Sequence, residues 1–377
     1  MTASGRIRVL IVDDSAVMRS LLRSVIMSDA GLEVAATAAD GATALESVRL
    51  DAPDLILLDV EMPVMDGLST LRQLRARRHT MPVIMCSSLT QHGARVTIEA
   101  LASGASDYVA KPTGQSGREA AARALAQELL PKIHALTASL QPRPAVAPAP
   151  RTVLPMPPVP QPAGYTPSKP LVLAIGVSTG GPAALDVLLP QLPRSFPLPV
   201  VIVQHMPEVF TRLLAERLGR RCSLQVTEAA EGMPATAGGV YIARGNWHLE
   251  TIAGQRPGAP VTLHLTQNAP ENHCRPAVDT LFRTVAHVYG SGVLAVVLTG
   301  MGYDGLAGAR VIREQGGAVL AQDQATSTVW GMPGAVAQAG LAYKVLPLAA
   351  IAPEILRVTS LPATPPMDAR NLARMVV

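Results

Sequence analysis

The chain is poor in the residues on which several classes of protein depend. Aromatic side chains make up only 3% of its 377 residues, so a surface that binds nucleic acid by stacking bases on rings is not expected. Its three cysteines, Cys86, Cys222 and Cys274, are widely spaced and form no CxxC pair, which argues against a disulfide framework and against a zinc site. No apolar run approaches the length of a membrane span. We therefore expect a cytoplasmic protein that does not insert into membranes.

The charge is nearly balanced. The formal net charge is +4, and Arg143, Arg151 and Lys169 lie in the segment 140–170, which has no acidic residue. Because neither flanking region is strongly basic, the positive excess is a weak argument for a nucleic-acid partner, and we expect none. The length fits two domains of ordinary size, and the hydrophobic content of 48% is sufficient for two packed cores.

Residues 6–136 alternate between strand and helix patterns five times. Apolar runs typical of buried strands occupy 8–12, 34–38, 55–60, 82–87 and 107–111. Segments with helical spacing follow them, at 17–25, 42–50, 68–76, 94–104 and 118–136. This alternation predicts an α/β domain of the flavodoxin-like class, with a five-stranded parallel sheet covered by helices on both faces.

Proline separates this region from the next one. The segment 140–170 contains eleven prolines, and proline fixes φ and removes an amide donor. We therefore expect the residues 137–170 to be a semi-rigid linker of polyproline II type, at about 3.1 Å per residue. A ligand for an SH3-like module is the alternative reading of the linker.

Residues 171–358 show a second alternating pattern, which predicts a doubly wound and mostly parallel α/β domain. Strands are expected at 171–178, 199–205, 293–300, 318–323 and 342–347. The runs 238–243 and 261–266 are expected to be antiparallel additions to this sheet. The segment 359–377 is expected to be a flexible tail.

Polar side chains gather where the strands of the first region end. Asp13 and Asp14 follow the first strand and Asp59 ends the third, while Ser87 ends the fourth and Lys111 the fifth. Ligand sites of open parallel sheets lie beyond the carboxyl ends of the strands. Clustered carboxylates require a hard cation between them, and Mg²⁺ is the natural occupant. A carboxylate beside Mg²⁺ and a lysine can accept a phosphoryl group as an acyl phosphate. Each aspartate taken alone is more simply a helix cap.

The first region resembles the response-regulator receiver family. The motifs that carry the resemblance are VDDS (12–15), DVEMPVMDG (59–67), CSS (86–88) and AKP (110–112). The resemblance implies that Asp59 is the phosphoryl acceptor and that Asp14 and Asp59 hold Mg²⁺. Asp13 would assist through water, and the backbone carbonyl of Glu61 would complete the metal site.

The same resemblance assigns roles to three further residues. Ser87 and Lys111 would bind the phosphoryl oxygens, and Tyr108 stands where the family has its switch aromatic, although a half-buried tyrosine is also ordinary packing. Gly67 follows Asp66 and fits a turn that needs positive φ.

Three groups with hydrolytic chemistry follow predicted strands of the second region. Ser178 ends the first strand and precedes two glycines and Pro182, a pattern typical of a strand–turn–helix junction with free amides. His205 ends the next strand, and Asp304 follows the strand 293–300. A hydroxyl, an imidazole and a carboxylate can act as nucleophile, general base and orienting acid if they meet. Their spacing alone does not show contact, and a lone serine there is more often a helix cap.

The second region resembles the catalytic domain of the chemotaxis protein-glutamate methylesterase (CheB) family. The motifs are GVSTGGP (176–182), QHMP (204–207), NHCRPAVDTLF (272–282), LTGMGYDG (298–305) and DQATSTVWGMPGAV (323–336). The resemblance implies Ser178 as nucleophile, His205 as general base and Asp304 as the orienting acid. It further implies Met301 as an oxyanion donor, with Thr179, Gly180 and His273 lining the site.

Together the two resemblances cover nearly the whole chain and predict a phosphorylation-activated enzyme. It would remove methyl esters from glutamate side chains of chemoreceptors, deamidate selected glutamines, and receive its phosphoryl group from a chemotaxis histidine kinase. Mg²⁺ is the one cofactor expected, in the receiver. A non-catalytic phosphoreceiver or docking protein is the alternative. A DNA-binding output is disfavoured because the second region is large, sheet-rich and close to neutral.

Overall fold

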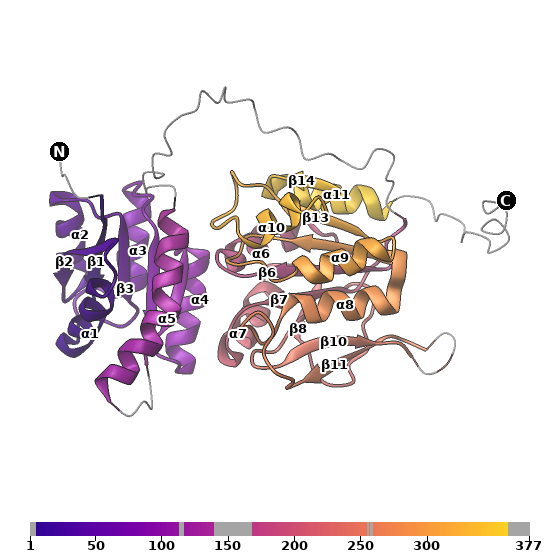
Figure 1. Ribbon diagram of the computed structural model, residues 1–377, viewed down its shortest axis with the longest axis horizontal. Helices are drawn as coiled ribbons and strands as arrows, with labels where there is room; N and C mark the ends of the chain where they lie inside the picture. Colours follow the sequence, from indigo (N-terminus) through magenta and orange to yellow (C-terminus); the bar gives the residue numbers. More distant parts are fainter. Residues whose placement is uncertain (1–4, 113–116, 139–167, 255, 257–258, 361–377) are drawn as a thin grey trace, which may run out of the picture.

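The computed structural model describes residues 5–112, 117–138, 168–254, 256 and 259–360. Most of the predicted linker and the tail from 361 lie outside these residues. Two α/β units stand side by side, and the C-terminal unit is the larger (Figure 1).

The N-terminal unit is a five-stranded parallel sheet in the order β2-β1-β3-β4-β5, as the sequence predicts. Its strands are β1 (Ile7–Val12), β2 (Leu32–Ala38), β3 (Leu55–Asp59), β4 (Val83–Ser87) and β5 (Asp107–Ala110). Its helices are α1 (Ala16–Met27), α2 (Gly41–Leu50), α3 (Gly67–Ala76), α4 (Gln91–Ala102) and α5 (Arg118–Thr137). Alternate residues of β1 enter opposite cores: Val9 and Ile11 pack with α1 and α5, and Leu10 and Val12 pack with α2, α3 and α4.

The C-terminal unit is built on a seven-stranded parallel sheet in the order β14-β13-β12-β6-β7-β9-β8. Its strands are β6 (Val172–Val177), β7 (Val200–Gln204), β8 (Gln225–Glu228), β9 (Gly239–Ile242), β12 (Val293–Val297), β13 (Ala318–Gln322) and β14 (Lys344–Leu346). Strands β10 (His248–Ile252) and β11 (Thr262–Thr266) form a separate antiparallel pair.

Helices cover both faces of this sheet (Figure 1). They are α6 (Gly181–Leu188), α7 (Glu208–Gly219), α8 (Val278–Tyr289), α9 (Leu306–Glu314), α10 (Met332–Gln338) and α11 (Leu348–Thr359), with 3-10 turns η1 (Leu189–Gln191) and η2 (Gly290–Gly292). Leu173 and Ile175 of β6 pack with α6, α7 and α11, whereas Val172 and Ala174 pack with α8, α9 and α10. This doubly wound arrangement confirms the predicted fold class.

One strand prediction is wrong. The run 238–243 is expected to be an antiparallel addition, but β9 pairs in parallel with both β7 and β8. All four residues of β9 are buried, as in a strand covered by helices on both faces, whereas a half-exposed antiparallel edge would alternate. The expectation of antiparallel pairing holds for 261–266, because β11 pairs in that sense with β10.

The two units contact each other through α4, α5 and β5 of the first and α6 and α7 of the second. The ring of Tyr108 stacks on that of Phe210 with centroids 4.5 Å apart. The buried cluster that holds apolar residues of α1, β1 and α5 also includes Val329 of the C-terminal unit, and Met301 packs against it. The hydrophobic core is thus continuous across the seam.

Gly67 has a different role from the one predicted. Its φ is not positive, and Val64 has the left-handed conformation in this loop, with φ of 65°. A Cβ on Gly67 would lie 2.0 Å from the backbone oxygen of Asp59 and 3.2 Å from the Met85 side chain. The glycine is therefore required by the close approach of α3 to the end of β3.

We predict that Gly67→Ala destabilises the protein by about 1–3 kcal/mol, because the new methyl group must displace the backbone at Asp59. Urea unfolding would measure this. Gly219→Ala is the control: its Cβ would meet the nearest atom at 3.4 Å, so its effect should stay within about 0.5 kcal/mol. Equal stabilities of Gly67→Ala and the native protein would contradict the steric argument.

Candidate functional site

The three residues predicted for hydrolysis follow three adjacent strands at the centre of the large sheet. Ser178 follows β6, His205 follows β7 and Asp304 lies beyond β12, and β6 is paired with both β7 and β12. The chain moves outward from β6 to one edge of the sheet and then returns to β12 and the other edge. This is the topological switch point at which doubly wound sheets form their ligand crevice.

His205 and Asp304 are in direct contact. The Nε2 atom of His205 lies 2.8 Å from Oδ2 of Asp304, and Asp304 is only 3% exposed. The carboxylate also accepts the backbone N–H groups of Val278, Asp279 and Gly305 at 2.6–3.0 Å. Burial alone would favour neutral forms, but the contact with Asp304 raises the pKa of His205, and the same contact lowers the pKa of Asp304. The contact therefore stabilises the imidazolium that forms when the ring accepts a second proton on Nδ1.

Ser178 occupies a strand–turn–helix junction beside this pair. Gly180 caps α6 with φ of 78°, and the side-chain amide of Gln204 donates to the carbonyl oxygen of Ser178 at 3.0 Å. Among the described residues no hydrogen bond joins the Ser178 hydroxyl to His205. The second ring nitrogen, Nδ1, lies 3.6 Å from Sγ of Cys274 instead. The three groups share one site, but the nucleophile and the base are not joined in this arrangement.

A cavity of about 730 Å³ contains Ser178, His205 and Asp304. Its walls also include Thr179, Gly180, His273 and Met301, so every residue predicted for this site lines the cavity. Within the described part of the chain, the backbone N–H groups of Thr179, Gly180 and Met301 donate no hydrogen bond. Such unpaired amides beside a serine can stabilise a developing oxyanion.

The N-terminal unit closes one side of the cavity. Asp107, Tyr108, Glu128 and Lys132 all line it. The hydroxyl of Thr179 donates to Oδ2 of Asp107 at 2.7 Å, and Asp107 is itself buried. A carboxylate of one unit thus holds the residue next to the candidate nucleophile of the other.

The predicted acidic pocket of the N-terminal unit is formed. Carboxylate oxygens of Asp13, Asp14 and Asp59 lie within 4.8 Å of one another, and Lys111 Nζ lies 2.9 Å from Asp13 and 2.7 Å from Asp59. Burial, together with the charge of Asp13, raises the pKa of Asp59 to about 6 although Lys111 opposes the shift. Three carboxylates against one lysine leave an excess of negative charge on an oxygen-only donor set, which fits Mg²⁺. Receiver domains generally bind Mg²⁺ through such acidic residues.

The remaining predicted residues surround this pocket. Ser87 is buried at the end of β4, and its Oγ accepts a hydrogen bond of 2.7 Å from Thr97 of α4. The backbone N–H of Glu61 faces the Asp59 carboxylate. Tyr108 lies in β5 at the seam, where burial raises the pKa of its hydroxyl well above the usual value.

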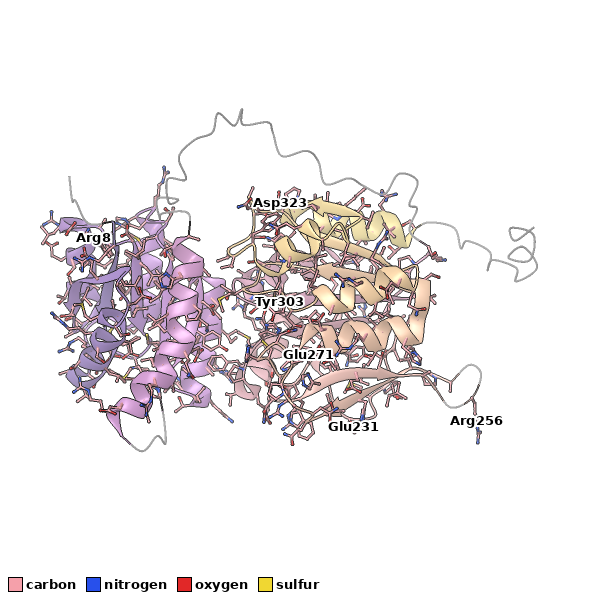
Figure 2. All side chains as sticks on the ribbon, in the orientation of Figure 1. Arg8, Glu231, Arg256, Glu271, Tyr303 and Asp323 are labelled. Carbon is pink, nitrogen blue, oxygen red and sulfur yellow. The ribbon has the colours of Figure 1, made fainter. Side chains whose placement is uncertain are left out.

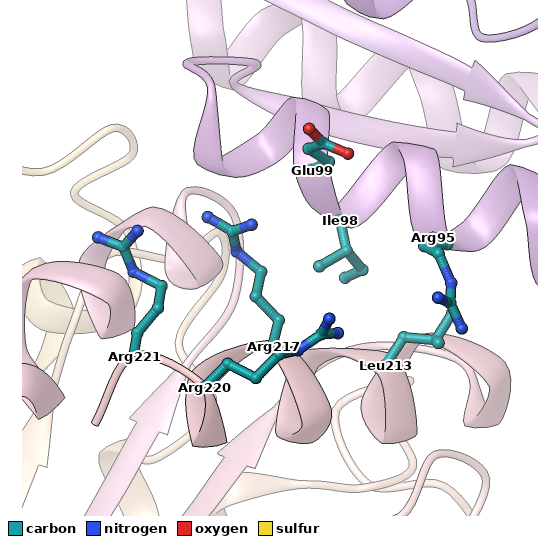
Figure 3. A pocket seen from close by; sticks show the side chains of 7 residues that line it. All are labelled: Arg95, Ile98, Glu99, Leu213, Arg217, Arg220 and Arg221. Carbon is teal, nitrogen blue, oxygen red and sulfur yellow. The ribbon is translucent and has the colours of Figure 1, made fainter. Parts of the chain in front are cut away.

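A second cavity in the seam has no catalytic group. About 270 Å³ in volume, it lies between α4 and α7 and is lined by Arg95, Ile98, Glu99, Leu213, Arg217, Arg220 and Arg221 (Figure 3). Arg217 and Arg221 pair with Asp186, and Glu99 pairs with Arg72. No ion pair of the described residues includes Arg95 or Arg220, and Arg95 also lines a neighbouring cavity with Glu208 and Glu216.

Sequence reasoning missed four residues of the site. Cys274 is within reach of His205, and Asp107 contacts Thr179 across the seam. Asn272 and Asp279 lie behind Asp304, to which the amide of Asn272 donates at 3.0 Å. Cys274, Asn272 and Asp279 all stand in the motif 272–282, so the signal was present, but only the fold shows that this loop closes over the strand ends.

The fold and the two sites define a class of protein: a phospho-receiver unit joined to a doubly wound hydrolase unit with a serine, a histidine and an aspartate at its switch point. Comparison with known families agrees. The family model described as CheB methylesterase matches residues 173–355, and that of the response regulator receiver domain matches residues 9–123. The chain belongs to the CheB methylesterase family, and its receiver and esterase units are those of an enzyme.

Relatives of this family match the chain over most of its length. The protein-glutamate methylesterase/protein-glutamine glutaminase of Nocardioides sp. is 48% identical, over 93% of this chain and 95% of its own. That of Trichodesmium erythraeum is 46% identical, over 93% and 99%. The crystal structure of the Thermotoga maritima CheB methylesterase catalytic domain is 42% identical, covers 50% of this chain and 98% of its own, and has a TM-score of 0.49.

Every helix in the described ranges is too short or too polar to cross a bilayer.

The raised pKa of Asp59 leads to a prediction about metal binding. Mg²⁺ competes with the proton on this carboxylate, so Mg²⁺ should raise the melting temperature by a few degrees at pH 7.5, and the increase should fade as the pH falls through about 6. Thermal unfolding with and without the ion at both pH values would measure this. Asp59→Asn should remove most of the increase at pH 7.5. An equal Mg²⁺ effect at pH 5 and 7.5 would contradict the assignment.

Proposed function

We propose that the protein hydrolyses γ-glutamyl methyl esters on the cytoplasmic helices of chemoreceptors and deamidates selected glutamines there. Ser178 would be the nucleophile, His205 the general base and Asp304 the acid that orients the imidazole. The 2.8 Å contact of His205 with Asp304, in a cavity that Ser178 also lines, is the observation that carries this proposal. The functional units would span 6–136 and 171–358, joined by 137–170.

The chemistry follows the placement of these groups. Ser178 Oγ attacks the ester carbonyl as its proton passes to His205 Nδ1, the nitrogen that Asp304 leaves available. The amides of Thr179, Gly180 and Met301 stabilise the oxyanion. His205 returns the proton to the departing methoxide, which leaves as methanol. Water then cleaves the acyl-enzyme and releases glutamate. With a glutamine substrate, ammonia leaves instead, by the same steps.

Two properties of this arrangement would keep the rate of the unphosphorylated protein low. The receiver unit lines the cavity, so a receptor helix would have to displace it. Thr179 is also tied to Asp107, which holds the serine turn in a geometry without a hydrogen bond from Ser178 to His205. Activation therefore amounts to a population shift from this closed arrangement to an open one.

Phosphorylation of Asp59 would supply that shift. A histidine kinase in the cytoplasm would be the phosphodonor, with Asp13, Asp14 and Asp59 holding Mg²⁺, which neutralises charge on the transferring group. Ser87 and Lys111 would bind the phosphoryl oxygens. To do so, the Ser87 hydroxyl must turn away from the carbonyl oxygen of Ser88, to which it now donates at 3.1 Å. The Oγ atom of Ser87 also accepts a hydrogen bond from Thr97, so this rotation acts on α4, the helix that packs on α7. Tyr108, stacked on Phe210, would move with it.

The non-catalytic alternative finds less support. A docking protein has no need for unpaired amides beside a serine or for a buried histidine–aspartate pair, and the relatives are named as enzymes.

The serine mechanism is tested by Ser178→Ala. Methanol release from methylated receptor should fall by at least about 10⁴-fold, because the acyl-enzyme can no longer form. A fluorophosphonate probe should label the native protein and not the variant. Retained methanol release would refute the assignment, and Ser223→Ala, outside the cavity, should behave as the native protein.

The closed contact is tested by Asp107→Ala. The substitution removes the hydrogen bond to Thr179, worth about 0.5–1.5 kcal/mol, and should raise unphosphorylated turnover by about two- to tenfold. It also removes the contacts of Asp107 with the Tyr108 N–H and with Lys132, which lie within the receiver unit. The ratio of turnover with acetyl phosphate to turnover without it should fall by the same factor. Glu46→Gln, on the exposed face of α2, serves as the control and should change neither quantity. A folded Asp107→Ala protein with native basal turnover would show that the contact does not restrain the enzyme.

A further inference from the structure

A second buried carboxyl group lies behind the His205–Asp304 pair. Asp279 is 2% exposed and stands in the first turn of α8. The side-chain amide nitrogen of Asn272 donates both to Oδ2 of Asp279 at 2.9 Å and to Oδ1 of Asp304 at 3.0 Å. One amide group therefore bridges two buried carboxyls.

The two carboxyls also fix the two helices that carry them. Asp304 precedes α9 yet accepts the first N–H groups of α8, from Val278 and Asp279. Asp279 belongs to α8 yet accepts the N–H of Gly308 in α9 at 2.6 Å. Each aspartate thus binds free amides at the start of the other's helix, where negative charge is favoured.

We propose that Asp279 and Asn272 are positioning residues of the esterase: Asp279 supplies a second negative charge that strengthens His205 as a base, and Asn272 limits that charge by binding both carboxylates. This inference rests on the proposed function of His205. Asp279 does not line the cavity that holds Ser178. Both residues act on His205 through Asp304, which the Asn272 amide and the Asp279 N–H contact.

Asp279 and Asn272 both affect the electrostatic potential at the His205 ring. Two carboxylates in one buried cluster repel each other, and burial together with Asp304 raises the pKa of Asp279. A charged Asp279 makes the potential at His205 more negative, which favours the imidazolium. The Asn272 amide stabilises both anions and so reduces this effect. Removing the carboxylate and removing the amide should then move the titration of His205 in opposite directions.

Other charged or titratable groups also face this region. They are Glu271, His273, Cys274 and Arg275 from the loop before α8, Arg283 from α8, Tyr303 from the loop before α9, and Asp107, Glu128 and Lys132 from the receiver unit. Glu271 is the carboxylate most like Asp279 in position, but it is paired with Arg283 and is 34% exposed. Figure 2 labels Glu271 and Tyr303 on the esterase unit.

The experiment measures the pH dependence of kcat/KM on methylated receptor for the full-length protein activated with acetyl phosphate and Mg²⁺. The acid limb of this profile reports the base of the free enzyme. Asp279→Asn should move the limb to lower pH by more than about 0.2 units, because it removes a negative charge from the cluster that stabilises the imidazolium. Asn272→Ala should move it to higher pH. Glu314→Gln, at the exposed end of α9 and outside the cluster, is the control and should leave it in place.

A double-mutant cycle and a second measurement complete the test. Asn272→Ala combined with Asp279→Asn should give a non-additive limb position, since the two residues share one contact. Histidine ring NMR should show the same opposite shifts for His205 in the variants, and this readout does not depend on turnover. Limbs and His205 titrations that stay within about 0.2 pH units of the native protein in both folded variants would overturn the proposal. If Ser178→Ala retained activity while the titrations shifted as stated, the proposed function would fail and this inference would survive.

Discussion

A single hydrogen bond, from the hydroxyl of Thr179 to the carboxylate of Asp107, joins the two chemical centres of the protein. Asp107 opens β5, the strand that leads to Lys111 in the acidic pocket, and Thr179 follows the candidate nucleophile. The bond is buried and 2.7 Å long, so it is strong while the seam excludes water and is lost when water enters. Any motion of β5 relative to the serine turn must break it. Control of the esterase by the receiver follows from this constraint.

Both centres meet the same physical difficulty, which is to bury several carboxylates close together. The receiver pocket balances Asp13 and Asp59 with Lys111 and with room for a divalent cation. The charge of this pocket changes when a cation or a phosphoryl group binds. The pKa of about 6 for Asp59 indicates that Lys111 alone does not offset burial and the charge of Asp13. The esterase site balances Asp304 with His205 and fixed amides. The charge of Asp304 is constant, because the N–H groups at the start of α8 stabilise it without a metal ion.

The sequence predicted the receiver sheet and the five strands β14, β13, β12, β6 and β7 of the larger sheet, because strand ends in parallel sheets are recognisable from apolar runs. Ser178, His205 and Asp304 each follow such a run. The parallel sense of β9 was missed, although a run without alternation is typical of a strand buried on both faces. Asp107 was equally inaccessible: the first residue of a strand in one unit has no sequence signal that points to a hydroxyl in another.

The receiver affects both access to the cavity and the alignment of Ser178 with His205, rather than access alone. If the receiver only covered the cavity, Ser178 and His205 could already be joined beneath it. Instead, Nδ1 of His205 lies next to Cys274, and the serine hydroxyl is not bonded to the ring. Release of Thr179 would therefore both open the cavity and let the serine turn settle against its base. A modest shift of the seam, of about 1.4 kcal/mol for each tenfold change in the open population, then acts on substrate access and on alignment together.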